Sequence, residues 1–440
     1  MKKQLILFAF LIAGLFSVQA QSEKIQFVEY DLDNGLHVIL HHDDRTPNVM
    51  VSIMYHVGAK NEDPSRTGFA HFFEHLMFEG SEYIDRGDYF GIVQAAGGSL
   101  NANTTQDRTY YYENMPSNQL ELALWMESER MLHAKIDTIG VNTQKGVVLE
   151  ERRQSYDNRP YGTFMEKLGE YAFKEHPYRW QTIGYAEHIQ AYQFEDIQNF
   201  YKTYYVPNNA VLVIAGDYDE RQTRQWIDKY FGNIPRGTLP IYRPHIVEPP
   251  QTKEVREIVY DDVQLPAIFM AYHAPANGTK ESYAMDILVQ IMSGGNSSRL
   301  TTNLDEKGIT LQSGLIYFQM EDPGLVYVIS IPNMGYTMEQ AEEALNKEFD
   351  RITTELVSEE EFQMAMAAKE FSTAAGLQSL SGVAYGLADN YTYFKDAGRV
   401  NSELERYEAV TREDVLAVAK KYLQPNSRVV LYYLSKSEQE

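Results

Sequence analysis

Two patterns of hydrophobic positions alternate along the chain. Short runs rich in β-branched residues at 38–40 and 51–55 predict β-strands, whereas the apolar positions of 119–132 recur at helical spacing. A further helix is predicted over 196–204, and the apolar run 211–215 that follows it predicts another strand. This mixture favours an α+β fold in which helices pack on a mixed sheet.

Two short motifs each occur twice, at almost the same separation. An acidic pair followed twelve residues later by Pro-Asn begins at Glu195 and again at Glu413, an offset of 218 residues. A Tyr-His pair that closes an apolar run begins at Tyr55 and at Tyr272, an offset of 217 residues. Because two separate motifs agree within one residue, the chain is interpreted as an internal duplication.

The duplication predicts two homologous α/β sandwich halves, at 22–235 and 256–440. The segment 236–255 between them is rich in proline, which cannot continue a helix or a central strand, so it is interpreted as an extended linker. With 440 residues the chain exceeds the size at which a single core keeps growing, in agreement with two units. The formal net charge of -23 argues against nucleic acid as a partner and is typical of a well-solvated surface.

The first 20 residues (1–20) are predicted to be a secretory signal peptide. Two lysines precede an apolar run from Leu5 to Val18, and Val18-Gln19-Ala20 is typical of a cleavage site. The run is shorter than the roughly 20 residues of a spanning helix and nothing comparable follows it, so no transmembrane segment is expected in the mature chain. The lack of cysteine excludes disulfides and a lipoprotein signal.

The most informative motif is His71-Phe72-Phe73-Glu74-His75. On a helix the two histidines lie one turn apart on one face, with Glu74 beside them. Two imidazoles are suitable zinc ligands, and the carboxylate between them can take a proton from water at the metal. The flanks are strongly apolar, which argues against the simpler interpretation of two polar residues on a solvent-exposed helix face.

A third metal ligand is expected in the segment 147–153, which contains Glu150 and Glu151 side by side. On a helix these carboxylates point about 100° apart, so only one can face the metal, and spacing alone does not choose between them. A surface salt bridge to Arg152, Arg153 or Lys145 is the alternative role for either one.

With these motifs the sequence resembles the pitrilysin, insulinase and mitochondrial processing peptidase family of inverted-motif zinc peptidases. The resemblance begins in the segment 68–80 and continues, in order, through the first half. It is also carried by Gly97-Gly98-Ser99-Leu100-Asn101-Ala102-Asn103-Thr104, Gly146 to Arg153, His176-Pro177-Tyr178, Gly184 and Tyr205 to Ala210.

The resemblance implies one zinc ion (Zn2+) per chain, held by His71, His75 and Glu151, with Glu74 as the catalytic residue. Many family members have a further glutamate seven residues before the distal ligand, where this sequence has Gln144. That difference would remove a supporting carboxylate without touching the three ligands.

The resemblance also implies that Asn101 and Ala102 lie on an edge strand that the substrate joins by backbone pairing. A glycine pair followed by small polar residues agrees with a close approach of a second backbone. The alternative is an ordinary glycine turn leading into the strand at 109–112.

The second half departs from the family pattern. The repeat offset carries the zinc motif onto Leu288, Ile291 and Met292, so no second metal site is expected. Family members supply an arginine and a tyrosine from this half to bind the substrate carbonyl. Here Asp305 stands at the arginine position and Leu311 or Gln312 at the tyrosine position, and an acid would repel a developing oxyanion.

These observations predict an exported zinc metalloendopeptidase or oligopeptidase acting on extended or unfolded peptides, with the periplasm favoured. We hypothesise that it is the zinc-bearing subunit of a heterodimer whose paralogous partner supplies the arginine and tyrosine. In the single-chain alternative, Arg299 or Tyr317 substitutes from nearby. A non-catalytic peptide-binding or structural subunit is the alternative function, disfavoured by the intact motif.

Overall fold

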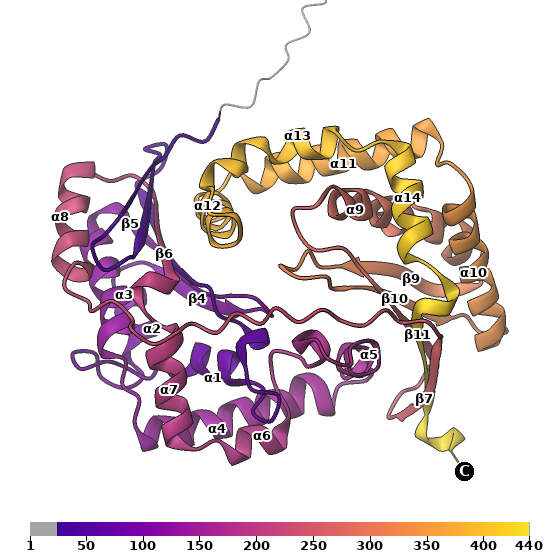
Figure 1. Cartoon of the computed structure of the whole chain (residues 1–440), viewed down its shortest axis with the longest axis horizontal. Helices are drawn as coiled ribbons and strands as arrows, with labels where there is room; N and C mark the ends of the chain where they lie inside the picture. Colours follow the sequence, from indigo (N-terminus) through magenta and orange to yellow (C-terminus); the bar gives the residue numbers. More distant parts are fainter. Residues whose placement is uncertain (1–23, 440) are drawn as a thin grey trace, which may run out of the picture.

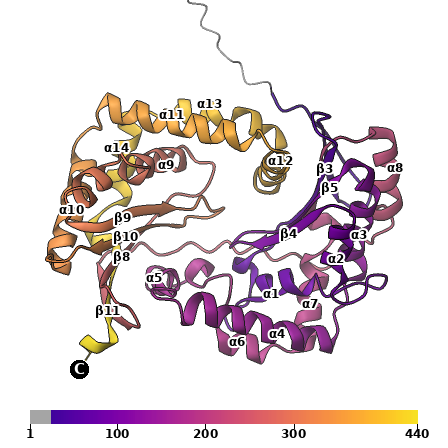
Figure 2. The same cartoon turned by 180° about the vertical axis from the view of Figure 1, so that it is seen from behind.

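The computed structural model of the chain describes residues 24–439, so the predicted signal peptide at 1–20 lies outside the described residues. Two sheets, each with its own helices, lie on opposite sides of the molecule (Figure 1), and the reverse view shows the same two-sided arrangement (Figure 2). The predicted fold class, two α/β halves with mixed sheets, is confirmed.

The first sheet has six strands in the order β1-β2-β6-β3-β5-β4. Their bounds are β1 Val28–Asp31, β2 His37–His42, β3 Asn48–Tyr55, β4 Ser99–Thr104, β5 Thr109–Pro116 and β6 Ala210–Gly216. β2 and β6 run parallel, and the other neighbours run antiparallel. β4 pairs with β5 alone and therefore forms one edge of the sheet.

The second sheet repeats this order as β7-β11-β8-β10-β9, without a counterpart of β1. Its strands are β7 Val255–Asp261, β8 Ala267–His273, β9 Thr310–Tyr317, β10 Leu325–Pro332 and β11 Arg428–Ser435. The single parallel pair, β7 with β11, corresponds to β2 with β6. The two sheets thus share both strand order and strand direction.

Each sheet has a layer of helices on one face. The first layer contains α1 Phe69–Leu76, α2 Asp88–Ala95, α3 Leu120–His133, α4 Thr138–Arg152, α6 Ala186–Ala191, α7 Phe194–Tyr204 and α8 Glu220–Phe231. The second contains α9 Lys280–Ser293, α10 Met338–Thr354, α11 Glu359–Gly376, α13 Glu403–Glu408 and α14 Arg412–Tyr422. Both layers bury a continuous apolar core against their sheet. Each large aliphatic side chain in these cores stabilises the fold by about 1.5–3 kcal/mol.

The opposite face of each sheet is covered by a helix that belongs to the other half. α12 (Leu380–Phe394) packs Val383 and Leu387 on Ile39 and Val213 of the first sheet. α5 (Phe164–Ala172) packs in the same way on the second sheet, with Leu168 in that core. Because both faces of each sheet are covered, the sequences of the central strands are nearly continuous apolar runs. The sequence did not reveal this reciprocal exchange.

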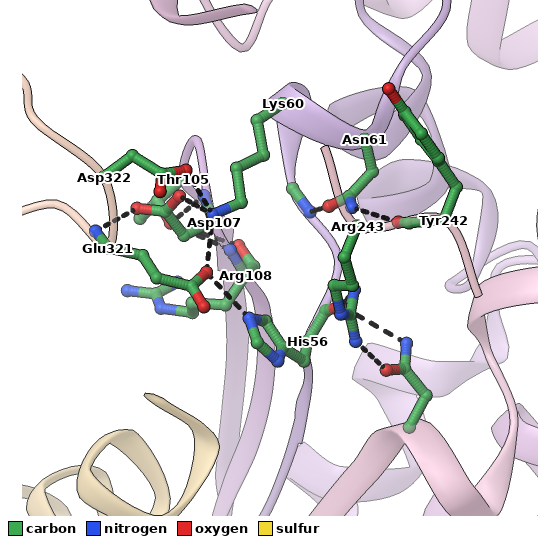
Figure 3. A network of polar contacts seen from close by, with 12 residues as sticks. His56, Lys60, Asn61, Thr105, Asp107, Arg108, Tyr242, Arg243, Glu321 and Asp322 are labelled. Carbon is green, nitrogen blue, oxygen red and sulfur yellow. Dashed lines mark hydrogen bonds and ion pairs between the residues drawn. The ribbon is translucent and has the colours of Figure 1, made fainter. Parts of the chain in front are cut away.

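The two halves are also joined by the linker and by a buried ionic cluster. Residues 232–254 have no regular structure beyond turns and cross the molecule between α8 and β7 (Figure 1). Between β9 and β10, Glu321 and Asp322 reach the first half, where the Lys60 ammonium lies 2.6 Å and 3.0 Å from their carboxylates and 3.0 Å from Asp107 (Figure 3).

Lys60 is 3% exposed, so its ion pairs are shielded from water. Burial alone would lower the pKa of Lys60, but the surrounding carboxylates of Asp107 and Glu321 raise it above its ordinary value. Removing one partner of such a buried cluster costs about 3–5 kcal/mol, because the remaining charges are left uncompensated. The loop between β9 and β10 is therefore firmly held against the first half.

Candidate active site

The helix α1, which carries the histidine motif, begins at a glycine that no other residue could replace without strain. Gly68 has a φ of 96°, and a Cβ there would lie 2.8 Å from the carbonyl oxygen of Ile183. The backbone N–H groups of Gly68 and Ala70 each donate to the buried carboxylate of Glu62 at 2.8 Å. Burial raises the pKa of Glu62 to about 8, so Glu62 caps α1 chiefly by accepting these two backbone hydrogen bonds.

Glu62 is a site residue that the sequence patterns did not single out. An acidic residue just ahead of a predicted helix start was the available signal, but its six-residue separation from Gly68 lies outside the usual capping spacing.

The faces of α1 separate cleanly into apolar and polar sides. Phe69, Phe72, Phe73 and Leu76 are buried in the core of the first half. His71, Glu74 and His75 are only partly buried and lie on the remaining face. The aromatic packing therefore fixes the helix rotation and with it the direction of the three polar side chains.

The structure brings His71, His75 and Glu151 together. The Nε2 atoms of the two histidines are 3.3 Å apart, and the Glu151 carboxylate lies 3.1 Å from Nε2 of His75 and 3.6 Å from Nε2 of His71. Glu151 comes from the last turn of α4, which packs beside α1. Glu150 points elsewhere, and its carboxylate accepts hydrogen bonds from Arg153 at 2.6 and 2.9 Å.

This group has the donor set and the protonation states that suit zinc. One nitrogen from each histidine and one carboxylate oxygen lie within 4.8 Å of one another, and two nitrogens with one oxygen are a common catalytic zinc set. Burial and the neighbouring His75 lower the pKa of His71 to about 4, which keeps its ring neutral. The hydrogen bond to His75 lowers the pKa of Glu151 and keeps it ionised. The residues therefore fit a zinc ion.

Glu74 lies beside this group and is held by the edge strand. Its Oε2 accepts a hydrogen bond of 2.6 Å from Oγ1 of Thr104, the last residue of β4. Burial raises the pKa of Glu74 above its ordinary value. Thr104 belongs to the sequence motif 97–104, but its contact with Glu74 was not predicted from that motif.

Asn101 and Ala102 lie on β4, at the open edge of the sheet. The backbone N–H of Ala102 donates to the side chain of its own neighbour Asn101 at 2.9 Å. The two glycines that precede β4, Gly97 and Gly98, are required by the turn that leads into this strand. Gly97 has a φ of 83°, and a Cβ on Gly98 would collide with Met115 of β5.

The second half has apolar or locally bonded residues at the equivalent places. Leu288, Ile291 and Met292 are buried in α9. Asp305 accepts hydrogen bonds from Oγ1 of Thr310 and the backbone N–H of Ser313. Its carboxylate is thus fixed within its own half.

Arg299 and Tyr317, the two nearby residues that could replace the missing arginine and tyrosine, also have other contacts. Arg299 forms a double hydrogen bond with Glu361 at 2.7 and 3.0 Å, and the hydroxyl of Tyr317 donates to the carbonyl of Pro275. Gln144, the departure from the family pattern in α4, donates to Glu79 at 2.6 Å.

Family models match both halves of the chain. Residues 37–184 match the model described as Insulinase (Peptidase family M16), and residues 191–369 match the model described as Peptidase M16 inactive domain. The chain is 27% identical over 422 residues to the zinc protease PqqE of Helicobacter pylori, covering 94% of each. It is 24% identical over 397 residues to an uncharacterised zinc protease of Mycobacterium tuberculosis, covering 89% of this chain and 90% of that protein.

Solved structures agree with the sequence relatives. A protease from Helicobacter pylori superposes with a TM-score of 0.88 at 26% identity, covering 93% of this chain and 99% of that one. The periplasmic protease PqqL from Escherichia coli shares the fold, with a TM-score of 0.76 at 17% identity over 94% of this chain and 48% of that one.

The fold and the two model matches define a two-half peptidase architecture. The chain belongs to the M16 peptidase family of pitrilysin and insulinase, in its short bacterial form. Within residues 24–439, none of the helices has the length and apolar character that a bilayer crossing requires.

Proposed function

We propose that this chain is an exported zinc metallopeptidase that hydrolyses extended or unfolded peptides, and that it acts as the zinc-bearing subunit of a heterodimer. The observation that carries the proposal is the convergence of His71, His75 and Glu151 beside a carboxylate, Glu74, tied to an open strand edge. In this proposal residues 22–235 form the zinc-bearing half and 256–440 the metal-free half.

The chemistry divides between the metal and the residues of the chain. Zinc, when bound by His71, His75 and Glu151, would supply a Lewis acid for the scissile carbonyl and for water. Glu74 takes a proton from the attacking water and later delivers it to the leaving amine. Its burial supports this role, because a raised pKa brings a carboxylate closer to the range in which it both accepts and releases a proton.

The open edge of β4 supports an extended peptide as the substrate. A peptide that pairs with an edge strand is recognised through its backbone, with little demand on sequence. Asn101 and Ala102 lie on this strand, and Thr104 at its end holds Glu74. A paired substrate would therefore run past the catalytic carboxylate.

The heterodimer rests on what the second half lacks. Asp305 stands where the family has an arginine, and Arg299 is already paired with Glu361. A paralogous chain that supplies an arginine and a tyrosine would complete the stabilisation of the oxyanion. Export rests on the predicted signal peptide, and the periplasmic relative PqqL agrees with that location.

The test is zinc analysis combined with a Glu74→Gln variant. We expect one zinc per chain in both proteins, and a loss of about 1,000-fold or more in kcat/KM on unstructured peptides for the variant. Glu150→Gln is the matched control, because it neutralises an exposed carboxylate on the neighbouring helix and should leave cleavage unchanged. Persistent cleavage by Glu74→Gln would contradict the mechanism.

The partner is tested in the same assay by adding candidate paralogous chains. We expect cleavage to rise when the correct chain is added. If the isolated chain were as fast as every mixture, the heterodimer would be wrong while the zinc mechanism would stand.

A further inference from the structure

A cavity of about 490 Å³ lies between the two halves, next to the candidate active site. It is lined by the turn from β4 to β5, by the segment around α5, by the loop between β9 and β10, and by α12. Its volume is within the range of sites that bind small molecules.

The cavity begins where the edge strand ends. Thr105, which lines the cavity, directly follows Thr104, whose hydroxyl holds Glu74. Each strand residue advances the chain by about 3.3 Å, so a peptide paired along β4 enters the cavity within a few residues of Glu74. On its other side the wall includes Thr182.

The lining is rich in aromatic side chains from both halves. Phe173 comes from the first half, and Phe318, Tyr327 and Tyr385 from the second. Such surfaces favour large apolar or aromatic groups, through burial and ring-to-ring contacts.

The charged groups in the wall offset one another. Asp107 is paired with Lys60 at 3.0 Å. Arg108 lies over the ring of Tyr385 at 5.5 Å and is bonded to the carbonyl of Asn103 at 3.0 Å. Burial raises the pKa of Asp389 to about 6, against the opposing effect of the Arg108 charge. No single sign of charge dominates, which favours an uncharged occupant.

The cavity is formed before any ligand binds. The loop that supplies Phe318 and Met320 also carries Glu321 and Asp322, whose carboxylates are fixed on Lys60 (Figure 3). A wall anchored in this way requires little ordering on binding, which strengthens selection for a matching side chain.

We propose that this cavity is a specificity pocket that binds a large apolar or aromatic side chain of the substrate, a few residues from the scissile bond on the side facing the turn between β4 and β5. The proposal rests on the proposed peptidase function, and it adds a preference that backbone pairing alone does not provide.

The test measures peptide binding rather than cleavage. In the Glu74→Gln background, fluorescein-labelled Gly/Ser-rich decapeptides with one Phe placed at successive positions are titrated by fluorescence anisotropy. We expect one register in which Phe binds about 10-fold more tightly than Ser, within the range for filling an apolar pocket. Phe318→Ala and Tyr385→Ala should each remove most of that preference. Both side chains are partly exposed, at 46% and 39%, so the fold should tolerate the changes.

Phe371→Ala is the matched control, because this side chain on α11 is 76% exposed and does not line the cavity. A preference that survives in both cavity variants, falls equally in the control, or is absent from every register would overturn the pocket. The proposed function fails independently if the unmodified zinc-loaded protein cleaves none of the peptides, alone or with its partner, while the binding preference remains.

Discussion

The helices α1 and α9 occupy equivalent places in the two halves, yet only α1 has polar side chains at the three positions of the histidine motif. His71, Glu74 and His75 line a partly open face, whereas the residues 217 positions later are buried apolar side chains of α9. The same helix-on-sheet arrangement thus accommodates apolar side chains at these three positions. The difference agrees with the proposal that the polar group of α1 serves a ligand and not the fold.

The difference can be tested first by giving position 71 of α1 the leucine that α9 has at the equivalent position. His71→Leu should abolish zinc binding and lower kcat/KM by about 1,000-fold or more, because one of three ligands is lost. The metal-free variant should be at least as stable as the metal-free parent, because the Nδ1 of His71 is buried without a hydrogen-bond partner. Zinc content, peptide cleavage and denaturant unfolding with chelator are the measurements.

The reciprocal change, Leu288→His, is the control for that interpretation. It should lower the free energy of unfolding by about 3 kcal/mol, because a polar ring replaces a fully buried side chain in α9. It should add no zinc. A stable Leu288→His protein, or a His71→Leu protein that unfolds on its own, would show that the two helices do not differ in the way proposed.

Most of the fold could be predicted from the sequence, because local patterns determine it. The run 211–215 and the helical spacing of 119–132 correspond to β6 and α3, within one or two residues. The exchange of α5 and α12 could not be predicted. Their apolar faces show only that each helix is covered, and the sequence does not say which sheet covers it.

The candidate site was predicted in part for a similar reason. His71, Glu74 and His75 share one helix turn, so their spacing alone places them together. Glu151 and Glu150 could not be distinguished by spacing, and the structure orients only Glu151 toward the histidines. Glu62 binds the backbone N–H groups of α1 from six residues ahead of Gly68, outside the usual capping spacing, so an acidic residue there was too weak a signal to predict this role.

The two helices also differ in how their N-termini are capped. α9 is capped by its own N-cap residue, Thr279, which accepts from the N–H of Ser282 at 3.1 Å, whereas α1 depends on the more distant Glu62. Glu62→Ala should lower the free energy of unfolding by about 2 kcal/mol and weaken zinc binding. Thr279→Ala should cost about 1 kcal/mol and leave zinc binding unchanged.

Unfolding curves and zinc titrations of the two cap variants provide the measurement. Equal zinc affinity in both would mean that the cap of α1 supports the fold alone. A selective loss of affinity in Glu62→Ala would place the cap among the residues that position His71 and His75.

The smallest expected effect concerns the contact that links α1 to the open edge strand. Thr104→Val keeps the β-branched shape of β4 but removes the hydroxyl that donates to Glu74. Without that bond the carboxylate is less firmly oriented, so kcat should fall by about 10-fold while zinc content stays unchanged. Thr143→Val, at an exposed position of α4 where the hydroxyl donates to the carbonyl of Ile139 in the same helix, keeps the contact between Thr104 and Glu74 and is the control. If Thr104→Val were as active as the parent, Glu74 would be positioned by α1 alone and the edge strand would serve only to bind the peptide.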